Sequence, residues 1–168
     1  MILELTLGII FIIISISLLL LVPLIIGAPF EPSKDDKIKT ILKLASPQKK
    51  DKIVDLGSGD GRIVIAFAEK GYEAHGYEIN PWLVLYSIII ARVKGAKNAH
   101  FHLGNFWNKN LSKFNIVTLF QIGYIMPKLE KKIEKECKSR TKIVSNKWTF
   151  PNINPKKIEN NVKLYIIN

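Results

Sequence analysis

The chain has 168 residues and a formal charge of +11, from 25 Lys and Arg against 14 Asp and Glu. Its single cysteine, Cys137, excludes an internal disulfide and a zinc cluster built on thiolates. The lysines are spread along the chain rather than gathered into an arginine-rich stripe, so the charge does not favour a nucleic-acid-binding protein.

The first feature in chain order is an apolar stretch, residues 5–26, which carries no charged side chain. As a helix it would be about 33 Å long, which is enough to cross a bilayer core of about 30 Å. A cleaved signal peptide would need a basic start and a shorter apolar run, whereas this start carries Glu4. We therefore expect a transmembrane anchor over residues 1–28.

The charges around this stretch predict its orientation. No Lys or Arg precedes it, and seven lysines follow it within residues 34–52. Because basic residues stay on the cytoplasmic side, we expect a single-pass protein whose folded domain lies on the cytoplasmic side of a prokaryotic plasma membrane.

Residues 29–51 are expected to form a linker and a helix that precedes the main domain. Prolines stiffen the linker, because each one fixes φ and discourages a helix before it. Ser33 is expected to cap the helix, with Asp35 and Asp36 in the first turn, where the helix dipole favours anions. Pro47 should follow its end.

The main domain, residues 52–168, should begin with a strand, a glycine turn and a helix. Residues 52–56 predict a buried parallel strand, and apolar residues at helical spacing resume after position 62. Between them lie Gly57, Gly59 and Gly61. Such a turn at a helix N-terminus is typical of nucleotide-binding sites, because glycine allows positive φ and lets a ligand lie against the backbone.

The spacing of the glycines separates two kinds of nucleotide site. The dinucleotide fingerprint would place its third small residue at position 62, which is Arg62 here. The chain instead resembles the motif of class I S-adenosylmethionine methyltransferases, which implies that cofactor as ligand. The motif comprises Asp55, Gly57, Ser58, Gly59, Asp60 and Gly61. Asp55 should orient the turn, by hydrogen bonds or through water to the amino group of the cofactor. A purely structural glycine turn is the alternative.

The second strand, expected over residues 73–79, ends beside an acidic residue. Glu78 lies about 23 residues after Asp55, and its carboxylate can accept hydrogen bonds from both ribose hydroxyls. Ile79, the next residue, is also expected to contact the cofactor. A helix over residues 82–94 should follow, and its almost wholly apolar centre suggests packing against a sheet.

The remaining segments complete an alternating pattern, with strands expected at 99–103, 116–121, 142–146 and 162–167 and a helix at 127–137. This pattern predicts an α/β fold with a parallel-dominated sheet flanked by helices. Together with the resemblance of the glycine motif, it implies a Rossmann-like class I methyltransferase domain behind the N-terminal transmembrane helix.

Loops after the later strands supply further candidate residues. The resemblance to class I methyltransferases implies that the loop after the third strand lies beside adenine, with Asn105 hydrogen-bonded to the base and Phe106 or Trp107 packed on it. A structural turn with a core aromatic residue is the alternative. Gln121, Tyr124 and Trp148 are candidates for the pocket that holds the methyl acceptor, on position alone. No general base stands out.

Three histidines, His75, His100 and His102, raise the question of a metal site. His100 and His102 share one face of a strand, but no carboxylate or thiol stands at ligand spacing. We expect core or edge histidines and no metal.

Two segments, residues 54–66 and 76–84, resemble the single-pass protein-lysine methyltransferases of mitochondria. Members of that family modify lysines of the ATP synthase c-subunit and of the adenine nucleotide translocase. The likeness extends to the linker 29–32, to residues 106–107 and to residues 129–132. It departs at Asn105, where the family usually carries Asp, and it is loose around the fourth strand. The resemblance implies a small prokaryotic member that methylates a lysine side chain of a membrane-associated protein.

Two other functions stay open on the sequence. One is a methyltransferase for a small-molecule or lipid-like acceptor, which the membrane anchor makes plausible. The other is a non-catalytic, membrane-tethered cofactor-binding module. An NAD-dependent enzyme is disfavoured by Arg62. The sequence predicts neither the oligomeric state nor the degree of methylation.

Overall fold

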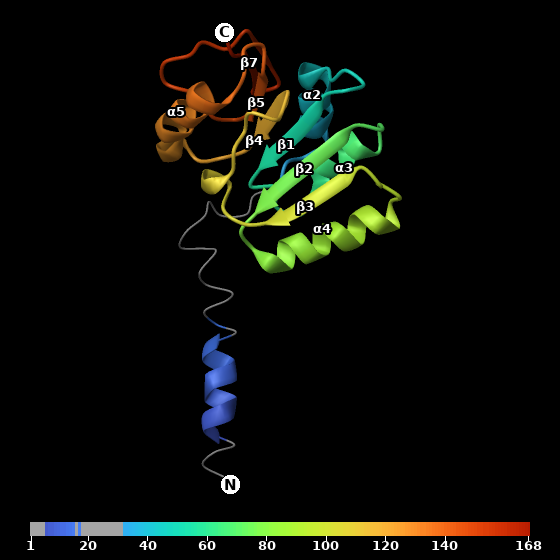
Figure 1. The fold of residues 1–168 in the computed structure, drawn as a ribbon, viewed down its shortest axis with the longest axis vertical. Helices are drawn as coiled ribbons and strands as arrows, with labels where there is room; N and C mark the ends of the chain where they lie inside the picture. Colours follow the sequence, from blue (N-terminus) through green and yellow to red (C-terminus); the bar gives the residue numbers. More distant parts are fainter. Residues whose placement is uncertain (1–5, 16, 18–31) are drawn as a thin grey trace. The chain divides into compact units, whose positions relative to one another are not determined.

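The computed structural model describes residues 6–15, 17 and 32–168, and the chain divides into two compact units, Met1–Phe30 and Glu31–Asn168 (Figure 1). In the first unit, residues 6–15 and 17 are helical. Within the described residues, no helix combines the length and the apolar character needed to cross a bilayer. Much of the predicted anchor, residues 1–5, 16 and 18–28, lies outside the described residues.

The second unit is built on a seven-stranded sheet with the strand order β3-β2-β1-β4-β5-β7-β6. The first five strands are parallel to one another, and β7 runs antiparallel to both β5 and β6. This arrangement confirms the predicted Rossmann-like α/β domain with a parallel-dominated sheet. The strands are β1 (Lys52–Leu56), β2 (Glu73–Glu78), β3 (Ala99–Leu103), β4 (Ile116–Leu119), β5 (Lys142–Asn146), β6 (Lys157–Glu159) and β7 (Val162–Ile166).

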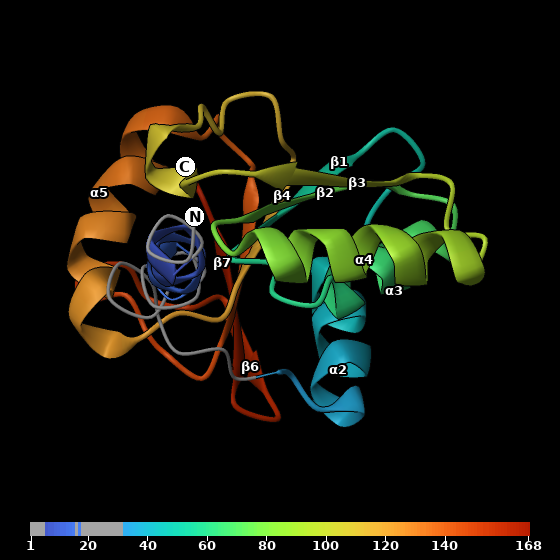
Figure 2. The same cartoon turned by 90° about the horizontal axis from the view of Figure 1, so that it is seen from below.

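Helices cover both faces of the sheet, with α2, α3 and α4 on one face and α5 on the other (Figure 2). The helices are α2 (Asp35–Ala45), α3 (Arg62–Ala68), α4 (Pro81–Val93) and α5 (Met126–Glu136), with short 3-10 turns η1 (Phe106–Asn108) and η2 (Gly123–Ile125). Strand β3 is an edge strand, and α4 runs beside it (Figure 1).

Two cores form because neighbouring side chains of a strand point to opposite faces. In β1, Val54 and Leu56 pack with Leu129 of α5 on one face. Ile53 packs with Ile41 of α2 on the other face, in a cluster that also holds residues of α3. Because β1 is buried on both sides, its continuous apolar run is typical of a central parallel strand.

Strand β6 was not predicted from the sequence. It has three residues and pairs with β7 through a two-residue turn, Asn160-Asn161, with φ of 48° and 56°. Two successive residues at positive φ are typical of the tightest hairpin turns, and asparagine tolerates this conformation. The Asn-Asn pair was therefore the available signal for the hairpin.

The prediction that Ser33 caps α2 was wrong. Lys34 occupies the cap position and makes no side-chain cap hydrogen bond. Ser33 is instead buried, and its Oγ accepts a hydrogen bond from Asn146 Nδ2 at 3.1 Å. The serine therefore joins the entry of α2 to β5.

The expectation that α4 packs its apolar centre against the sheet was only partly right. Its buried residues are Val84, Ser87 and Ala91, which form a narrow inward face. Its other face leaves large apolar side chains exposed, namely Trp82, Leu85, Tyr86, Ile89 and Val93. The sheet ends at β3, so nothing among the described residues covers that face.

Candidate functional site

The glycine turn lies at the carboxyl end of β1, where the strand order reverses between β1 and β4. Gly57, Gly59 and Gly61 have φ of 76°, 55° and 79°. The backbone N–H groups of Gly57 and Ser58 both donate to the carbonyl of Tyr77, at 2.9 and 3.0 Å. The turn is thus tied to β2, and it opens at the crevice where α/β sheets bind ligands.

Glu78 closes the turn from the end of β2. Its Oε2 accepts a hydrogen bond from the N–H of Gly59 at 2.9 Å. Its Oε1 accepts from the N–H groups of Ile79 and Asn80, both at 2.8 Å. A carboxylate offers about four acceptor positions, so these three donors leave room for a further hydroxyl donor.

Asp55 lies beneath the turn and is 2% exposed. Its register partner on β4 is Thr118, whose Oγ1 donates to Asp55 Oδ1 at 2.7 Å. Burial raises the pKa of the Asp55 carboxyl to about 7; the nearby carboxylates of Glu78 and Asp60 add to the effect, and the Thr118 hydrogen bond opposes it. Asp55 is therefore a buried carboxyl that is hydrogen-bonded to β4 and ionises near neutral pH.

The raised pKa predicts that an Asp55→Asn variant gains stability at high pH. Between about pH 4 and pH 7 the folded state holds a proton that the unfolded chain has released, so the free energy of unfolding falls as pH rises. The asparagine keeps an acceptor for Thr118 and cannot ionise. We expect the variant to exceed the wild type by about 1–3 kcal/mol at pH 8 and to differ little at pH 4.5.

Urea unfolding without cofactor at the two pH values checks this expectation. An Asp35→Asn variant, changed at an exposed carboxylate in the first turn of α2, serves as the control and should not exceed the wild type at pH 8. A variant advantage of equal size at both pH values would mean that ionisation of Asp55 is not its cause.

Two members of the glycine motif face protein atoms rather than the open side of the turn. A Cβ at Gly61 would lie 2.6 Å from Phe101 of β3 and 2.7 Å from Ser87 of α4. Ser58 is buried against Gly76 of β2, and among the described residues its hydroxyl has no hydrogen-bond partner. The structure therefore gives Gly61 a packing role, whereas the sequence suggested close approach of a ligand.

Arg62 is a residue whose role sequence reasoning missed. Its guanidinium pairs with the carboxylate of Asp60, with Nη2 to Oδ2 at 2.5 Å, and its Nη1 donates to the carbonyl of Ser33 at 2.8 Å. The turn is therefore fastened to the entry of α2. The available signal was a long basic residue directly after the last glycine, at the position that a dinucleotide site keeps small.

The loop after β3 is a capped 3-10 turn. Asn105 Oδ1 accepts a hydrogen bond from the N–H of Trp107 at 3.0 Å, so the amide nitrogen is the group that remains for a ligand. Phe106 and Trp107 lie with ring centroids 4.9 Å apart, and both pack against the core on the α5 side. Lys132 of α5 holds the loop through the carbonyls of Trp107 and Lys109, at 3.1 and 2.8 Å.

The three candidate acceptor-pocket residues follow β4 and β5. Gln121 is buried, and its Nε2 donates to the carbonyl of Leu56 at 2.6 Å, where it fills the space that a Cβ on Gly57 would need. Trp148 stacks over Gly123, since a Cβ there would lie 2.9 Å from its ring. Tyr124 is 79% exposed. Gln121 thus belongs to the glycine turn, while Tyr124 and the half-exposed Trp148 are available to an acceptor.

Glu130 of α5 fixes the segment that carries Trp148. It is 1% exposed, and its carboxylate accepts from the N–H groups of Asn152 and Ile153, both at 2.9 Å, and from Asn152 Nδ2 at 2.9 Å. Sequence reasoning noted residues 129–132 only for their resemblance to a family. Glu130 and Lys132 prove to anchor two different loops around the site.

The three histidines form a stack on β2 and β3. His75 Nδ1 and His102 Nε2 are 3.1 Å apart, and His75 also stacks on His100 with centroids 4.9 Å apart. Burial lowers the pKa of both His75 and His102. Among the described residues no group of three potential ligands could hold a metal ion.

The chain is similar in sequence to known proteins. Residues 55–157 match the family model of the ANTKMT methyltransferase domain. The ATP synthase c-subunit lysine N-methyltransferase of Xenopus laevis is 38% identical over 74% of the chain and 55% of the relative. A protein-lysine N-methyltransferase of Saccharolobus islandicus is 31% identical over 77% of the chain and 83% of the relative.

Solved structures agree with these sequence matches. An RNA methyltransferase from Salinibacter ruber, in complex with S-adenosyl-L-homocysteine, superposes with a TM-score of 0.77 and 29% identity. That match covers 82% of the chain and 94% of the neighbour. The chain spans about half the length of the ATP synthase c-subunit lysine N-methyltransferases that it matches.

Proposed function

The chain belongs to the family of the ANTKMT methyltransferase domain, and from this membership we propose that it transfers a methyl group from S-adenosylmethionine to a lysine side chain of a membrane-associated protein. The match to the Saccharolobus islandicus protein-lysine N-methyltransferase carries the proposal, because it spans 83% of that protein. The animal relatives support a membrane protein as acceptor, since their names specify the ATP synthase c-subunit and the adenine nucleotide translocase.

The residues at the glycine turn fit S-adenosylmethionine. Gly57 exposes a left-handed backbone at the end of β1, Gly59 is buried next to it, and Glu78 keeps acceptor capacity for a ribose hydroxyl beside them. Among the described residues, the Asn105 side chain bonds through Oδ1 to Trp107, which leaves its amide nitrogen for a ligand on the side where adenine is expected. When bound, the cofactor supplies an electrophilic methyl group on a sulfonium that leaves readily.

The protein's own task is then to position the acceptor. A lysine must be neutral to attack, and only about one lysine in 2,500 is neutral at pH 7 with a reference pKa near 10.4. A dry approach to the turn would favour the neutral amine. Trp148 and Tyr124 are suited to line that approach, because both follow strands that end at the turn and both leave ring surface exposed. The two aromatic rings would hold the amine in line with the methyl group.

Transfer of a labelled methyl group tests the proposed function. Purified full chain is incubated with methyl-labelled S-adenosylmethionine and membranes from cells that lack the protein, with a Glu78→Ala variant in parallel. Label should appear in one protein band and be recovered as methyl-lysine after hydrolysis. The variant should transfer little.

Label in any other fraction would contradict a lysine side chain as the methyl acceptor. Label in the lipid or small-molecule extract would favour a lipid-like acceptor. Label in RNA would favour the activity named for the Salinibacter ruber neighbour. Cofactor binding without transfer to any fraction would favour the non-catalytic module.

We also propose that residues 5–26 anchor the protein in a membrane, with the methyltransferase domain on the cytoplasmic side. The uncharged length of this stretch and the lysines that follow it support the proposal. The full chain should stay in membranes washed with alkaline carbonate, whereas a chain that lacks residues 1–28 should be released. Equal release of both would contradict the anchor.

A further inference from the structure

The exposed face of α4 is an apolar surface of the methyltransferase domain that the proposed function leaves unused. Its side chains are Trp82, Leu85, Tyr86, Ile89 and Val93, each between 49% and 79% exposed. At about 100° of turn per residue, these five positions fall within an arc of about 100°. The buried residues Val84, Ser87 and Ala91 lie on the opposite side, so the helix shows one apolar face to the sheet and a second to the outside.

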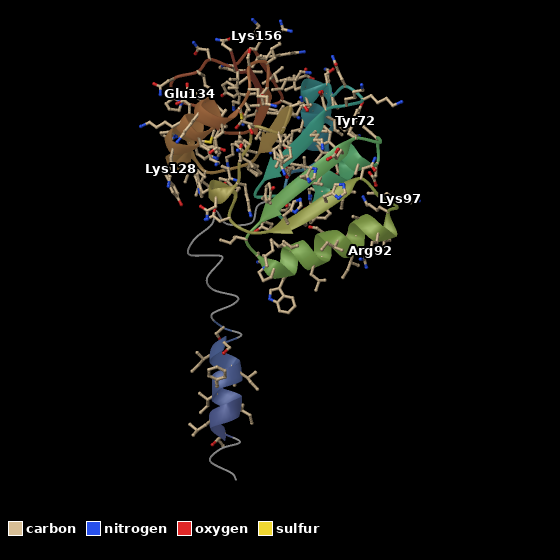
Figure 3. The ribbon with its side chains drawn as sticks, in the orientation of Figure 1. Tyr72, Arg92, Lys97, Lys128, Glu134 and Lys156 are labelled. Carbon is tan, nitrogen blue, oxygen red and sulfur yellow. The ribbon has the colours of Figure 1, made fainter. Side chains whose placement is uncertain are left out.

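Basic side chains border this face, and α4 contains no acidic residue. Arg92, Lys94 and Lys97 are exposed at the end of the helix and in the turn beyond it. Figure 3 shows Arg92 and Lys97 together at this end. Glu69 is the one carboxylate within ion-pair distance of these three in the part of the chain that the structure describes, at 3.6 Å from Lys94.

A groove next to the basic end of α4 is lined by two of these basic residues, Arg92 and Lys97. It has a volume of about 500 Å³ and lies between the second half of α4 and the edge strand β3. Arg92, Lys97, His100 and His102 line it, together with apolar residues that range in size from alanine to phenylalanine. A basic groove beside an apolar helix face offers a phosphate group and an acyl chain separate places to bind.

The composition of the face distinguishes a lipid surface from a protein partner. Trp and Tyr are enriched where protein meets the headgroup region of a bilayer, because each joins an apolar ring to a polar tip. A helix with apolar residues on one face, basic residues at its edge and no acidic residue matches the helices that lie in the plane of an anionic bilayer. We propose that α4 lies on an anionic lipid bilayer, with this face inserted among the headgroups.

The position of α4 links this surface to the site. The helix starts at Pro81, directly after Glu78, Ile79 and Asn80, whose backbone and side-chain bonds close the glycine turn. A helix held on the bilayer would therefore hold the carboxyl end of β2 at the level of the headgroups. This consequence rests on the proposed function, and it would suit an acceptor lysine close to the membrane surface.

Fluorescence quenching in vesicles tests the proposal on the full chain. An Ile89→Cys variant carries a bimane label on the face, and a Glu134→Cys variant carries it on the exposed side of α5 as the matched control. Burial raises the pKa of Cys137 to about 12, so the native thiol should stay unlabelled at neutral pH. Each protein is reconstituted into phosphatidylglycerol vesicles with or without brominated acyl chains.

The label at position 89 should lose at least about half of its fluorescence in brominated vesicles, and the label at position 134 should lose little. An Arg92→Glu, Lys97→Glu double change in the Ile89→Cys protein should reduce the quenching, and so should vesicles of neutral lipid. Salt at 0.5 M should also reduce it, because it shortens the Debye length about two-fold relative to physiological salt. Equal quenching at both positions would overturn the proposal, as would none at position 89.

Self-association through α4 is the competing arrangement. It would shift the emission of the position-89 label with the ratio of protein to lipid rather than with bromination, and this outcome would also overturn the proposal. Because the readout does not involve methyl transfer, a failure here is separate from a failure of the proposed function.

Discussion

A Gly61→Ala variant should lose about 3–5 kcal/mol of unfolding free energy, whereas Gly71→Ala should lose about 1–2 kcal/mol. Both glycines have a left-handed backbone, with φ of 79° and 86°, so both variants carry the conformational cost of a side chain there. The two positions differ in the room that they leave for a Cβ atom. A Cβ at Gly61 would meet Phe101 and Ser87 at 2.6 and 2.7 Å, while a Cβ at Gly71 has no heavy atom within 4 Å.

Urea unfolding followed by circular dichroism measures both losses. The difference between the two variants isolates the contact of the turn with β3 and α4, because the backbone cost is common to both. A Gly61→Ala, Ser87→Gly double variant should recover part of the loss, since it removes one of the two clashing side chains. Equal losses at Gly61 and Gly71 would show that Gly61 is needed for its backbone alone.

Replacing Glu78 with alanine should weaken S-adenosylmethionine binding by about 100-fold or more. The change removes the proposed ribose acceptor, and it also frees the N–H groups of Gly59, Ile79 and Asn80 from their shared partner. The glycine turn then loses its tie to the start of α4. We expect a smaller loss of about 1–2 kcal/mol in unfolding free energy from the same hydrogen bonds.

Calorimetric titration with the cofactor checks the binding loss. Glu73→Ala is the matched control, because it removes a carboxylate from the opposite end of the same strand, where the side chain is 41% exposed and paired with Lys52. This control should bind within about two-fold of the wild type. Unchanged affinity in the Glu78→Ala protein would remove Glu78 from the cofactor site.

The strand, glycine turn and helix at the centre of the domain could be predicted because their signals are local. β1, β3 and β5 have the predicted bounds, since each is a five-residue segment with apolar residues at its centre, bordered by turns. The glycines at alternate positions likewise predicted where the turn lies. Turn chemistry and burial act over a few residues, so a single segment contains all the information that is needed.

The supports of the site could not be predicted because their partners are distant in sequence. Glu130 and Lys132 lie in a charged helix that looks solvent-exposed, yet they bond to loops 20 to 25 residues away. Arg62 reaches a carbonyl 29 residues before it. A polar residue shows no local sign of such a partner, so only the fold reveals it.

The exposure of α4 illustrates a third limit. Its apolar composition correctly predicted a helix beside the sheet, but it could not tell how much of the helix the sheet would cover. That depends on β3 being the last strand of its edge, which is a property of the strand order. A mostly apolar helix over a central strand would have been buried on more of its surface.

The contact between the first helix of the domain and its last hairpin bears on how the domain folds during synthesis. Lys37 Nζ donates to the carbonyl and to Oδ1 of Asn160, at 2.6 and 2.7 Å, and Asn160 Nδ2 donates to Asp36. Some 123 residues separate these partners, and Lys43 also pairs with Glu159. While a ribosome still holds residue 160, α2 lacks these bonds, and closing so long a loop is slow. The nascent domain should therefore keep α2 open to proteases until the hairpin has emerged from the ribosome, so the pairing of α2 with the hairpin should come late in folding.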